Sequence, residues 1–324
     1  MSALLKSREA ILALAIALLL VVIASRFPAF VTPGNLASVF TDTSPLILLA
    51  LGQMVVILTK CIDLSVTANL ALCGMIAALM NGAGVPLPLI LLLVVALGAV
   101  LGAVNGLLVW KLDIPSIVVT LGTMTIYRGI IFLLTDGKWV NAHQMSEGFK
   151  AFPRAVFLGL PVMAWIAILG IVAFVLLVNR TPLGRAFYAV GGNPHAAVYT
   201  GISVGRTQFA AFVLSGALAG FVGYLWVARY AVAYVDIASG FELDVVAACV
   251  IGGIAIAGGA GSVAGCVMGA LFLGIMKNAL PVVGISPFWQ MAISGAAILI
   301  AIAFNARGSG PKGRLILKTP EVRA

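Results

Sequence analysis

Long apolar runs recur along this 324-residue chain, and they constrain its fold more than any other feature. A helix crosses the ~30 Å hydrocarbon core of a bilayer in about twenty residues, which is the length of these runs. Hydrophobic residues make up 62% of the chain and charged residues only 9%, against about 25% charged residues in soluble domains. Runs such as Ala13–Ile23 do not alternate, which excludes a membrane β-barrel. The sequence therefore predicts an all-α polytopic membrane protein.

The apolar runs predict about ten membrane-spanning helices. They lie at 10–25, 44–60, 64–80, 86–110, 114–135, 156–178, 207–228, 243–257, 261–280 and 287–304. The eighth and ninth are short and rich in glycine, so the predicted number is eight to ten. The stretch 252–261 is a poor continuous helix, which predicts either a broken or re-entrant segment or close helix packing. The pattern Gly98-x-x-x-Gly102 in the first half weakly matches Gly265-x-x-x-Gly269 in the second. This match is compatible with two inverted five-helix halves.

Lysine and arginine are distributed unevenly over the loops. With the N-terminus in the cytoplasm, the inner segments hold twelve, namely Lys6, Arg8, Lys60, Lys111, Arg180, Arg185, Arg206, Arg307, Lys312, Arg314, Lys318 and Arg323. The outer segments hold five, namely Arg26, Lys138, Lys150, Arg154 and Arg229. This excess is expected of cytoplasmic loops. It predicts one transmembrane domain over 1–306, with a cytoplasmic loop at 179–206 and a basic cytoplasmic tail at 307–324. The net charge of +9 therefore needs no nucleic-acid partner.

The sequence carries no motif for chemistry of its own. It lacks the phosphate-binding pattern of an ATPase, paired carboxylates within the spans, and any His or Cys spacing typical of a metal site. We therefore expect a non-enzymatic transport subunit without a resident cofactor or metal. Arg128 and Lys277 fall within spans and are expected to snorkel toward the membrane surface. No acidic residue lies at a span centre, so a transporter of this kind needs an external motor.

Two groups of residues are candidates for function. Polar residues within spans could line a pathway for a neutral, hydroxyl-rich solute, although hydrogen bonding between helices is the plainer role for each: Gln53, Asn69, Asn105, Thr120, Thr123, Asn278 and Gln290. The second group lies in the loop 179–206. There Asn193 is a good N-cap, Pro194 suits the first helical position and Gly201 suits a left-handed C-terminal cap. This pattern predicts a very short helix, which needs a surface to dock against.

Six sequence words now combine into a resemblance. They are Cys61–Val66, Ile114–Met124 with Arg128-Gly129, Gly184–Asn193, Phe241–Asp244 with Val250–Gly253, Gly258–Val263, and Phe288–Gln290. In this order, across about 44–304, the chain resembles the permease subunits of bacterial ATP-binding-cassette (ABC) importers for monosaccharides, the family of ribose, xylose, rhamnose and autoinducer-2 permeases. It departs from the family at Cys61 and Thr67, where glycine is usual, and at His195, where an acidic residue is usual. These departures bear on the sugar rather than on the family.

The resemblance implies the remaining expectations. The permease would lie in the bacterial inner membrane as a homodimer, or as a heterodimer with a paralogue. A cytoplasmic ABC ATPase would bind ATP and Mg, and a periplasmic binding protein would deliver the sugar. Rhamnose or another pentose or deoxy sugar is the first expectation. The short helix would be the coupling helix that contacts the ATPase, with Gly184, Arg185, Gly191, Gly192, Asn193, Pro194, His195, Ala196, Ala197 and Gly201 as coupling residues.

Two other functions stay open at this point. One is an ion-coupled secondary carrier for small polar solutes, and the other is a membrane scaffold without transport. Neighbouring genes for an ATPase and a periplasmic binding protein would favour the importer. Transport in reconstituted vesicles would exclude the scaffold.

Overall fold

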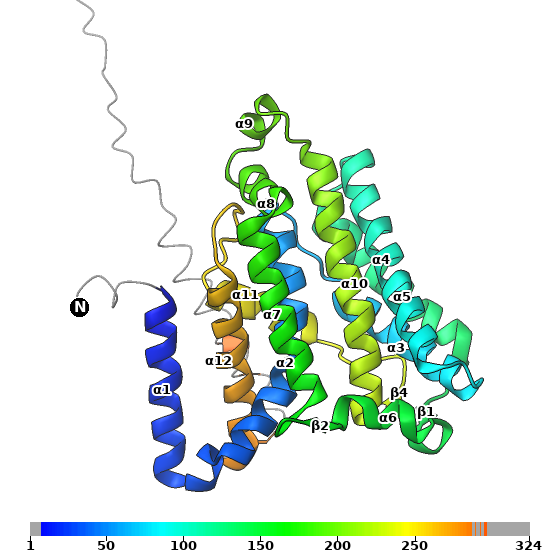
Figure 1. Cartoon of the computed structure of the whole chain (residues 1–324). Coiled ribbons are helices and arrows are strands. Elements are labelled where there is room, and N and C mark those ends of the chain that lie inside the picture. Colours follow the sequence, from blue (N-terminus) through cyan, green and yellow to red (C-terminus); the bar gives the residue numbers. More distant parts are fainter. Residues whose placement is uncertain (1–7, 287–288, 290–291, 293–294, 297–324) are drawn as a thin grey trace, which may run out of the picture.

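The computed structural model describes residues 8–286 together with 289, 292, 295 and 296, and it is a bundle of helices (Figure 1). Seven helices in this part of the chain are long and apolar enough to cross a membrane: α1 (Arg8–Arg26), α2 (Pro33–Leu58), α4 (Leu87–Leu112), α5 (Ser116–Thr135), α7 (Val162–Arg180), α10 (Val204–Tyr230) and α12 (Val263–Val282). A shorter apolar helix, α3 (Val66–Gly82), lies among them. The predicted all-α polytopic fold is thus confirmed, whereas the inverted halves stay a prediction. Most of the predicted tenth span, the residue Gln290 and the tail 307–324 lie outside the described residues.

The two ends of the bundle carry different short elements (Figure 1). One end, here called the α9 end, carries α8 (Pro182–Gly192) and α9 (Pro194–Tyr199). The other, the α6 end, carries η3 (Ala142–Gln144), α6 (Glu147–Arg154) and four two-residue strands. Strand β1 (Val140–Asn141) pairs antiparallel with β4 (Val232–Ala233), and β2 (Val156–Phe157) pairs antiparallel with β3 (Leu160–Pro161). The turn η2 (Pro28–Val31) joins α1 to α2.

Helix α2 is the central element of the bundle. Its residues are buried almost continuously from Thr43 to Leu58, and it contacts α7, α8, α10, α11 and α12. A helix that is apolar on every side is expected in such a buried position. In contrast, α1 packs on α12 and leaves residues such as Leu14 and Leu18 exposed, as expected of a helix that faces lipid. The bundle is therefore organised around α2.

Glycine allows α4 and α10 to touch along their backbones. A Cβ atom added to Gly98 would lie 2.3 Å from the carbonyl oxygen of Gly216, and one added to Gly102 would lie 2.2 Å from that of Phe212. Gly220 makes the reciprocal approach to Val94. Within lipid no hydrophobic effect drives helices together, so close packing through small residues drives their association instead. The Gly98-x-x-x-Gly102 pattern thus fixes the contact between α4 and α10.

One predicted span is shorter than expected because its helix breaks, and another non-helical segment lies between α2 and α3. Residues 59–65 separate α2 from α3 without forming a helix. The predicted span 243–257 ends early, since α11 covers only Phe241–Ile251 and residues 252–262 are not helical. Both readings of the glycine-rich stretch are realised there, because Gly252 and Gly265 also touch through their backbones. The described part of the chain therefore contains breaks at 59–65 and at 252–262.

Gly102→Ala should destabilise the protein, because the new methyl group meets the Phe212 carbonyl and α4 must move away from α10. We expect a loss of about 2 kcal/mol in the free energy of unfolding, the usual scale for an overpacked contact. Gly122→Ala on α5 is the matched control, since its Cβ would meet nothing within 4 Å. Thermal unfolding of the detergent-solubilised protein measures both. Equal melting temperatures for the two variants would contradict the assigned contact.

Candidate functional site

The six-residue helix α9 is defined at both ends by the residues that the sequence indicated. The Asn193 side chain accepts a hydrogen bond from the Ala196 N–H at 3.1 Å, and Pro194 occupies the first turn. At the other end Gly201 has φ +82°, and its N–H and that of Ile202 donate to the last turn of α9. These features are an N-cap and a left-handed C-terminal cap. The predicted short helix is confirmed in position and in both caps.

Helix α8 precedes α9 and was not predicted. The Thr181 hydroxyl accepts from the Gly184 N–H at 3.1 Å, and Pro182 occupies the first turn. Gly184 is buried against α7, where its added Cβ would lie 2.3 Å from the Val178 carbonyl oxygen. The pair Thr181-Pro182 is a cap signal visible in the sequence, but the glycines at 191 and 192 favoured a loop. They are the last two residues of α8.

The tip of α9 presents apolar side chains outward. Tyr199 is 92% exposed and Val198 is 59% exposed, whereas Ala197 is buried against the protein. Arg185, His195 and Ala196 are exposed, as Val198 and Tyr199 are. An exposed aromatic side chain beside an aliphatic one is typical of a contact with another protein. The sequence reasoning missed Val198 and Tyr199 as candidate contact residues.

The C-terminus of α8 meets the second break at a junction of glycine backbones. A Cβ on Gly191 would lie 1.8 Å from the Leu58 carbonyl oxygen and 2.3 Å from the Gly259 nitrogen. A Cβ on Gly259 would lie 2.3 Å from the Gly192 nitrogen. We call these contacts of Gly191 and Gly192 with Gly258 and Gly259 the glycine junction. No residue with a side chain could replace Gly191 without moving one of three segments.

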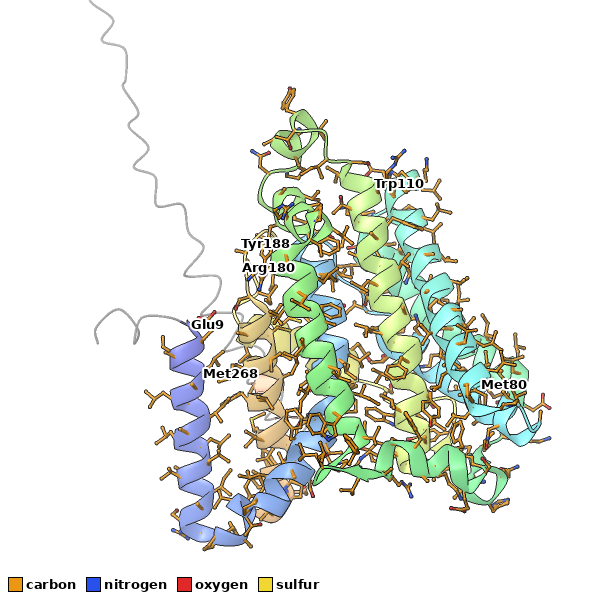
Figure 2. The ribbon with its side chains drawn as sticks, in the orientation of Figure 1. Glu9, Met80, Trp110, Arg180, Tyr188 and Met268 are labelled. Atoms are coloured by element: carbon orange, nitrogen blue, oxygen red, sulfur yellow. The ribbon has the colours of Figure 1, made fainter. Side chains whose placement is uncertain are left out.

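Hydrogen bonds reinforce the glycine junction. The Gly259 N–H donates to the Leu58 carbonyl at 3.0 Å, which fastens the break at 252–262 to the end of α2. The Tyr188 hydroxyl of α8 donates to the Gly261 carbonyl at 2.9 Å, and burial raises the pKa of this phenol. Figure 2 labels Tyr188 near the α9 end of the bundle. Helix α8 is thus attached both to α2 and to the loop before α12.

A second cluster of polar contacts closes the break at 59–65. With its amide oriented to suit its neighbours, Gln53 donates to the carbonyl and accepts from the N–H of Asp63, at 3.1 Å each. The Asp63 carboxylate accepts from the backbone and the hydroxyl of Ser65, and Asn105 donates to that hydroxyl at 2.8 Å. Ser116 accepts from the Ile62 N–H at 3.1 Å. Three helices therefore contribute side chains that satisfy the polar groups of this break.

The predicted pathway residues are mostly occupied with such contacts. Gln53, Asn69, Asn105 and Thr120 are buried, and Asn69 donates to the Gly98 carbonyl at 3.2 Å. Thr120 and Thr123 donate to carbonyls of their own helix, and so does Asn278. In this part of the chain the plainer alternative, hydrogen bonding between or within helices, describes what these side chains do. A role for them in lining the pathway stays a prediction.

Helix α11 begins far from both ends of the bundle rather than at one of them. Glu242 in its first turn accepts from the Thr67 hydroxyl at 2.7 Å, in the first turn of α3. The start of α3 lies beside the middle part of α4, because Asn69 reaches Gly98 and Ser65 reaches Asn105. Two helix N-termini therefore meet far from either end of the bundle. Acidic side chains suit such a place, since the helix dipole is positive there.

The two cations within spans have protein partners. Lys277 of α12 forms an ion pair with Asp244 of α11, and Arg128 of α5 donates to the carbonyls of Val235 and Ile237. Snorkelling of Lys277 and Arg128 stays a prediction, and the structure adds that both cations have partners within the protein. Charges in a bundle interior are stabilised by pairing with each other or with backbone carbonyls. No local pattern in the sequence indicates these partners, because they come from distant segments.

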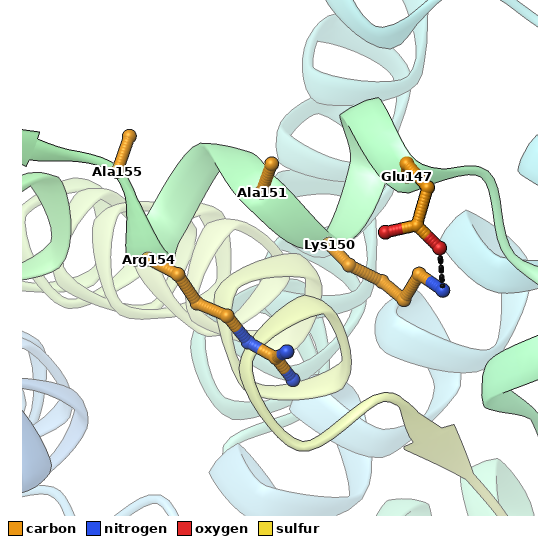
Figure 3. A pocket seen from close by; sticks show the side chains of 5 residues that line it. All are labelled: Glu147, Lys150, Ala151, Arg154 and Ala155. Atoms are coloured by element: carbon orange, nitrogen blue, oxygen red, sulfur yellow. Dashed lines mark hydrogen bonds and ion pairs between the residues drawn. The ribbon is translucent and has the colours of Figure 1, made fainter.

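The α6 end forms an exposed surface. Helix α6 carries a shallow pocket of about 370 Å³ lined by Glu147, Lys150, Ala151, Arg154 and Ala155 (Figure 3). Lys150 and Glu147 pair at 2.7 Å, and this contact holds the pKa of the carboxyl below its usual range. Arg154 reaches the Arg229 carbonyl at the end of α10. Lys150 and Arg154 belong to the segments that the distribution of Lys and Arg assigns to the outside.

Comparison with known proteins decides the family. A model described as "Branched-chain amino acid transport system / permease component" matches residues 35–302. The chain belongs to this permease family. The match covers both breaks, the α8–α9 segment and almost all of the described bundle from α2 onward, so the matched region includes the features described above.

Named relatives fit the resemblance drawn from the sequence. The autoinducer 2 import system permease protein LsrC of Klebsiella pneumoniae is 37% identical over 307 residues, covering 95% of this chain and 89% of its own length. The ribose import permease protein RbsC of Bacillus subtilis is 37% identical over 292 residues, covering 90% and 91%. No solved structure matches the chain. Membership of the monosaccharide permeases, as expected from the six sequence words, is confirmed.

Gln53→Leu should destabilise the permease, because it leaves the N–H and carbonyl of Asp63 buried without partners. Two unpaired backbone groups cost about 2–4 kcal/mol in the free energy of unfolding. Asn278→Leu is the control, since it removes a single bond within one helix turn. Denaturant unfolding followed by tryptophan fluorescence compares them. A Gln53→Leu protein of normal stability with altered uptake would assign Gln53 to the pathway instead.

Proposed function

We propose that this permease is the transmembrane subunit of an ABC importer that carries a monosaccharide-like solute into the cytoplasm. The support for the solute class is the similarity to relatives named for autoinducer 2 and ribose. Rhamnose, or another pentose or deoxy sugar, is the specific solute that we propose to test first. The hydrolysis of ATP and the binding of Mg belong to a partner ATPase.

In this proposal the α9 end faces the cytoplasm and the α6 end faces the periplasm. The excess of Lys and Arg in the loops assigned to the inside supports this orientation, as does the basic tail, and both termini are then cytoplasmic. The exposed surface of α6 is then available to a periplasmic sugar-binding protein. The permease works as a dimer in the inner membrane, either with a second copy or with a paralogue.

One observation carries the coupling role. Helix α9 projects beyond the bundle with Tyr199 almost fully exposed, yet it is capped at both ends and directly follows α8. A rigid, projecting helix that is joined to the transmembrane helices can be displaced by a partner and can transmit the displacement to those helices. In this proposal Gly191 and Gly192 hold the element against the transmembrane bundle, and Val198 and Tyr199 contact the ATPase.

The intramembrane pair Asp244–Lys277 favours a second candidate, the ion-coupled carrier. Ionisable residues within spans often mark ion pathways. The pair is also explained as a contact that holds α11 against α12, which suits either function. Uptake by vesicles that contain ATP but no ion gradient separates the two, since only the importer would remain active.

Tyr199→Ala should reduce sugar uptake at least tenfold while the protein still inserts and folds, because the side chain is almost fully exposed on its own chain. Aromatic anchors at interfaces are worth about 2 kcal/mol or more. Leu18→Ala on the exposed face of α1 is the control. The measurements are uptake and copurification of the ATPase. Full uptake by the Tyr199→Ala permease would refute a coupling contact at α9.

Proteoliposomes that contain the permease with its partner ATPase and binding protein should import a monosaccharide with ATP hydrolysis. We expect competition by related sugars and none by leucine or valine. This outcome separates the relatives' named substrates from the amino acids named in the family description. Import of a branched-chain amino acid alone would contradict the proposed solute class.

A further inference from the structure

The α8–α9 element touches the rest of the molecule at several places, and one of them leads to the middle of the bundle. The glycine junction and the Tyr188–Gly261 hydrogen bond join α8 to the break at 252–262. That break is the covalent link between α11 and α12. A displacement of α8 therefore acts on the loop between these two helices.

The two helices on either side of the break are held together tightly. A Cβ on Gly269 of α12 would lie 2.1 Å from the Ala248 carbonyl oxygen of α11, and Gly252 and Gly265 approach each other as closely. The ion pair Asp244–Lys277 adds a contact at the far end of α11. Helix α11, the loop 252–262 and α12 are thus expected to move as one unit, which we call the α11–α12 unit.

The far end of this unit lies where two broken helices meet. The start of α11 contacts the start of α3 through Glu242 and Thr67, beside the middle of α4. The segment that leads into α11 is irregular, and Ser239 and Gly240 are exposed. Irregular backbone at membrane depth is tolerated where protein or a water-filled cavity covers it. A movement of the α11–α12 unit would change that region directly.

We propose that Tyr188, together with the glycine junction, passes the movement of α8–α9 to the α11–α12 unit, and that displacement of the start of α11 changes access to the solute pathway. Tyr188 is a positioning residue in this scheme, since it acts through the Gly261 carbonyl. The proposal rests on the proposed function, because a coupled ATPase supplies the movement.

The test uses the complete complex of permease, ATPase and binding protein. Ser239→Cys places a thiol at the exposed approach to α11, and the native thiols Cys61, Cys73, Cys249 and Cys266 are buried and should give little background. The rate at which the introduced thiol reacts with a small methanethiosulfonate reagent is measured without nucleotide and with ATP trapped by vanadate. Uptake and ATP hydrolysis are measured on the same preparations.

Tyr188→Phe, made in the Ser239→Cys permease, removes only the hydroxyl that reaches Gly261. We expect ATP consumed per solute imported to rise about fivefold, the factor that corresponds to one neutral hydrogen bond. We also expect the nucleotide-dependent change in labelling of the introduced thiol to shrink, while the ATPase still copurifies. Tyr224→Phe is the matched control, since its hydroxyl donates to the Phe149 carbonyl at 3.0 Å at the α6 end. It should leave both readouts unchanged.

The outcomes separate this inference from the proposed function. If the Ser239→Cys permease responds to nucleotide and Tyr188→Phe alters neither readout, the transmission route is overturned and the importer stands. If Tyr188→Phe and Tyr224→Phe act equally, the effect is general destabilisation and the route is again overturned. If the Ser239→Cys permease binds no ATPase and its transport ignores ATP, the proposed function fails and the inference fails with it.

Discussion

Every backbone N–H and carbonyl that a broken helix exposes within a membrane must find a partner in the protein, and the rest of this structure depends on how that is done. The break at 59–65 is closed by side chains from three helices, with Gln53 bonded to both backbone groups of Asp63. The break at 252–262 is closed by the end of α2 and by Tyr188 of α8. Each break therefore joins helices that are remote in the sequence.

Close backbone contact through glycine supplies the rigidity that these breaks require. The same device fixes α4 against α10 and α11 against α12, and joins α8 to the second break. Contacts of this kind leave no room for side chains to rearrange, so a displacement at one element is carried to its neighbour. In the proposed transmission route, the α8–α9 element and the α11–α12 unit shift relative to α2.

The structure shows where the three residues lie at which the sequence departs from the resemblance to its family. Thr67 stands where glycine is usual, and its hydroxyl is the donor to Glu242 at the meeting of α3 and α11. Cys61 is buried in the first break, and His195 lies on α9. Two departures, Cys61 and Thr67, are therefore buried in the bundle, and the third, His195, lies on the surface that we assign to the ATPase.

The sequence by itself determined the helical membrane fold, most of the span positions, and the caps of α9, because these follow from the length of apolar runs and from residues adjacent in the chain. It also determined the family, through six words in a fixed order. Only the tertiary structure decided that α8 is helical to its last glycine, that Lys277 pairs with Asp244, and that Gln53 closes a break. Those results depend on groups brought together from distant segments, and no local pattern records which of them will meet.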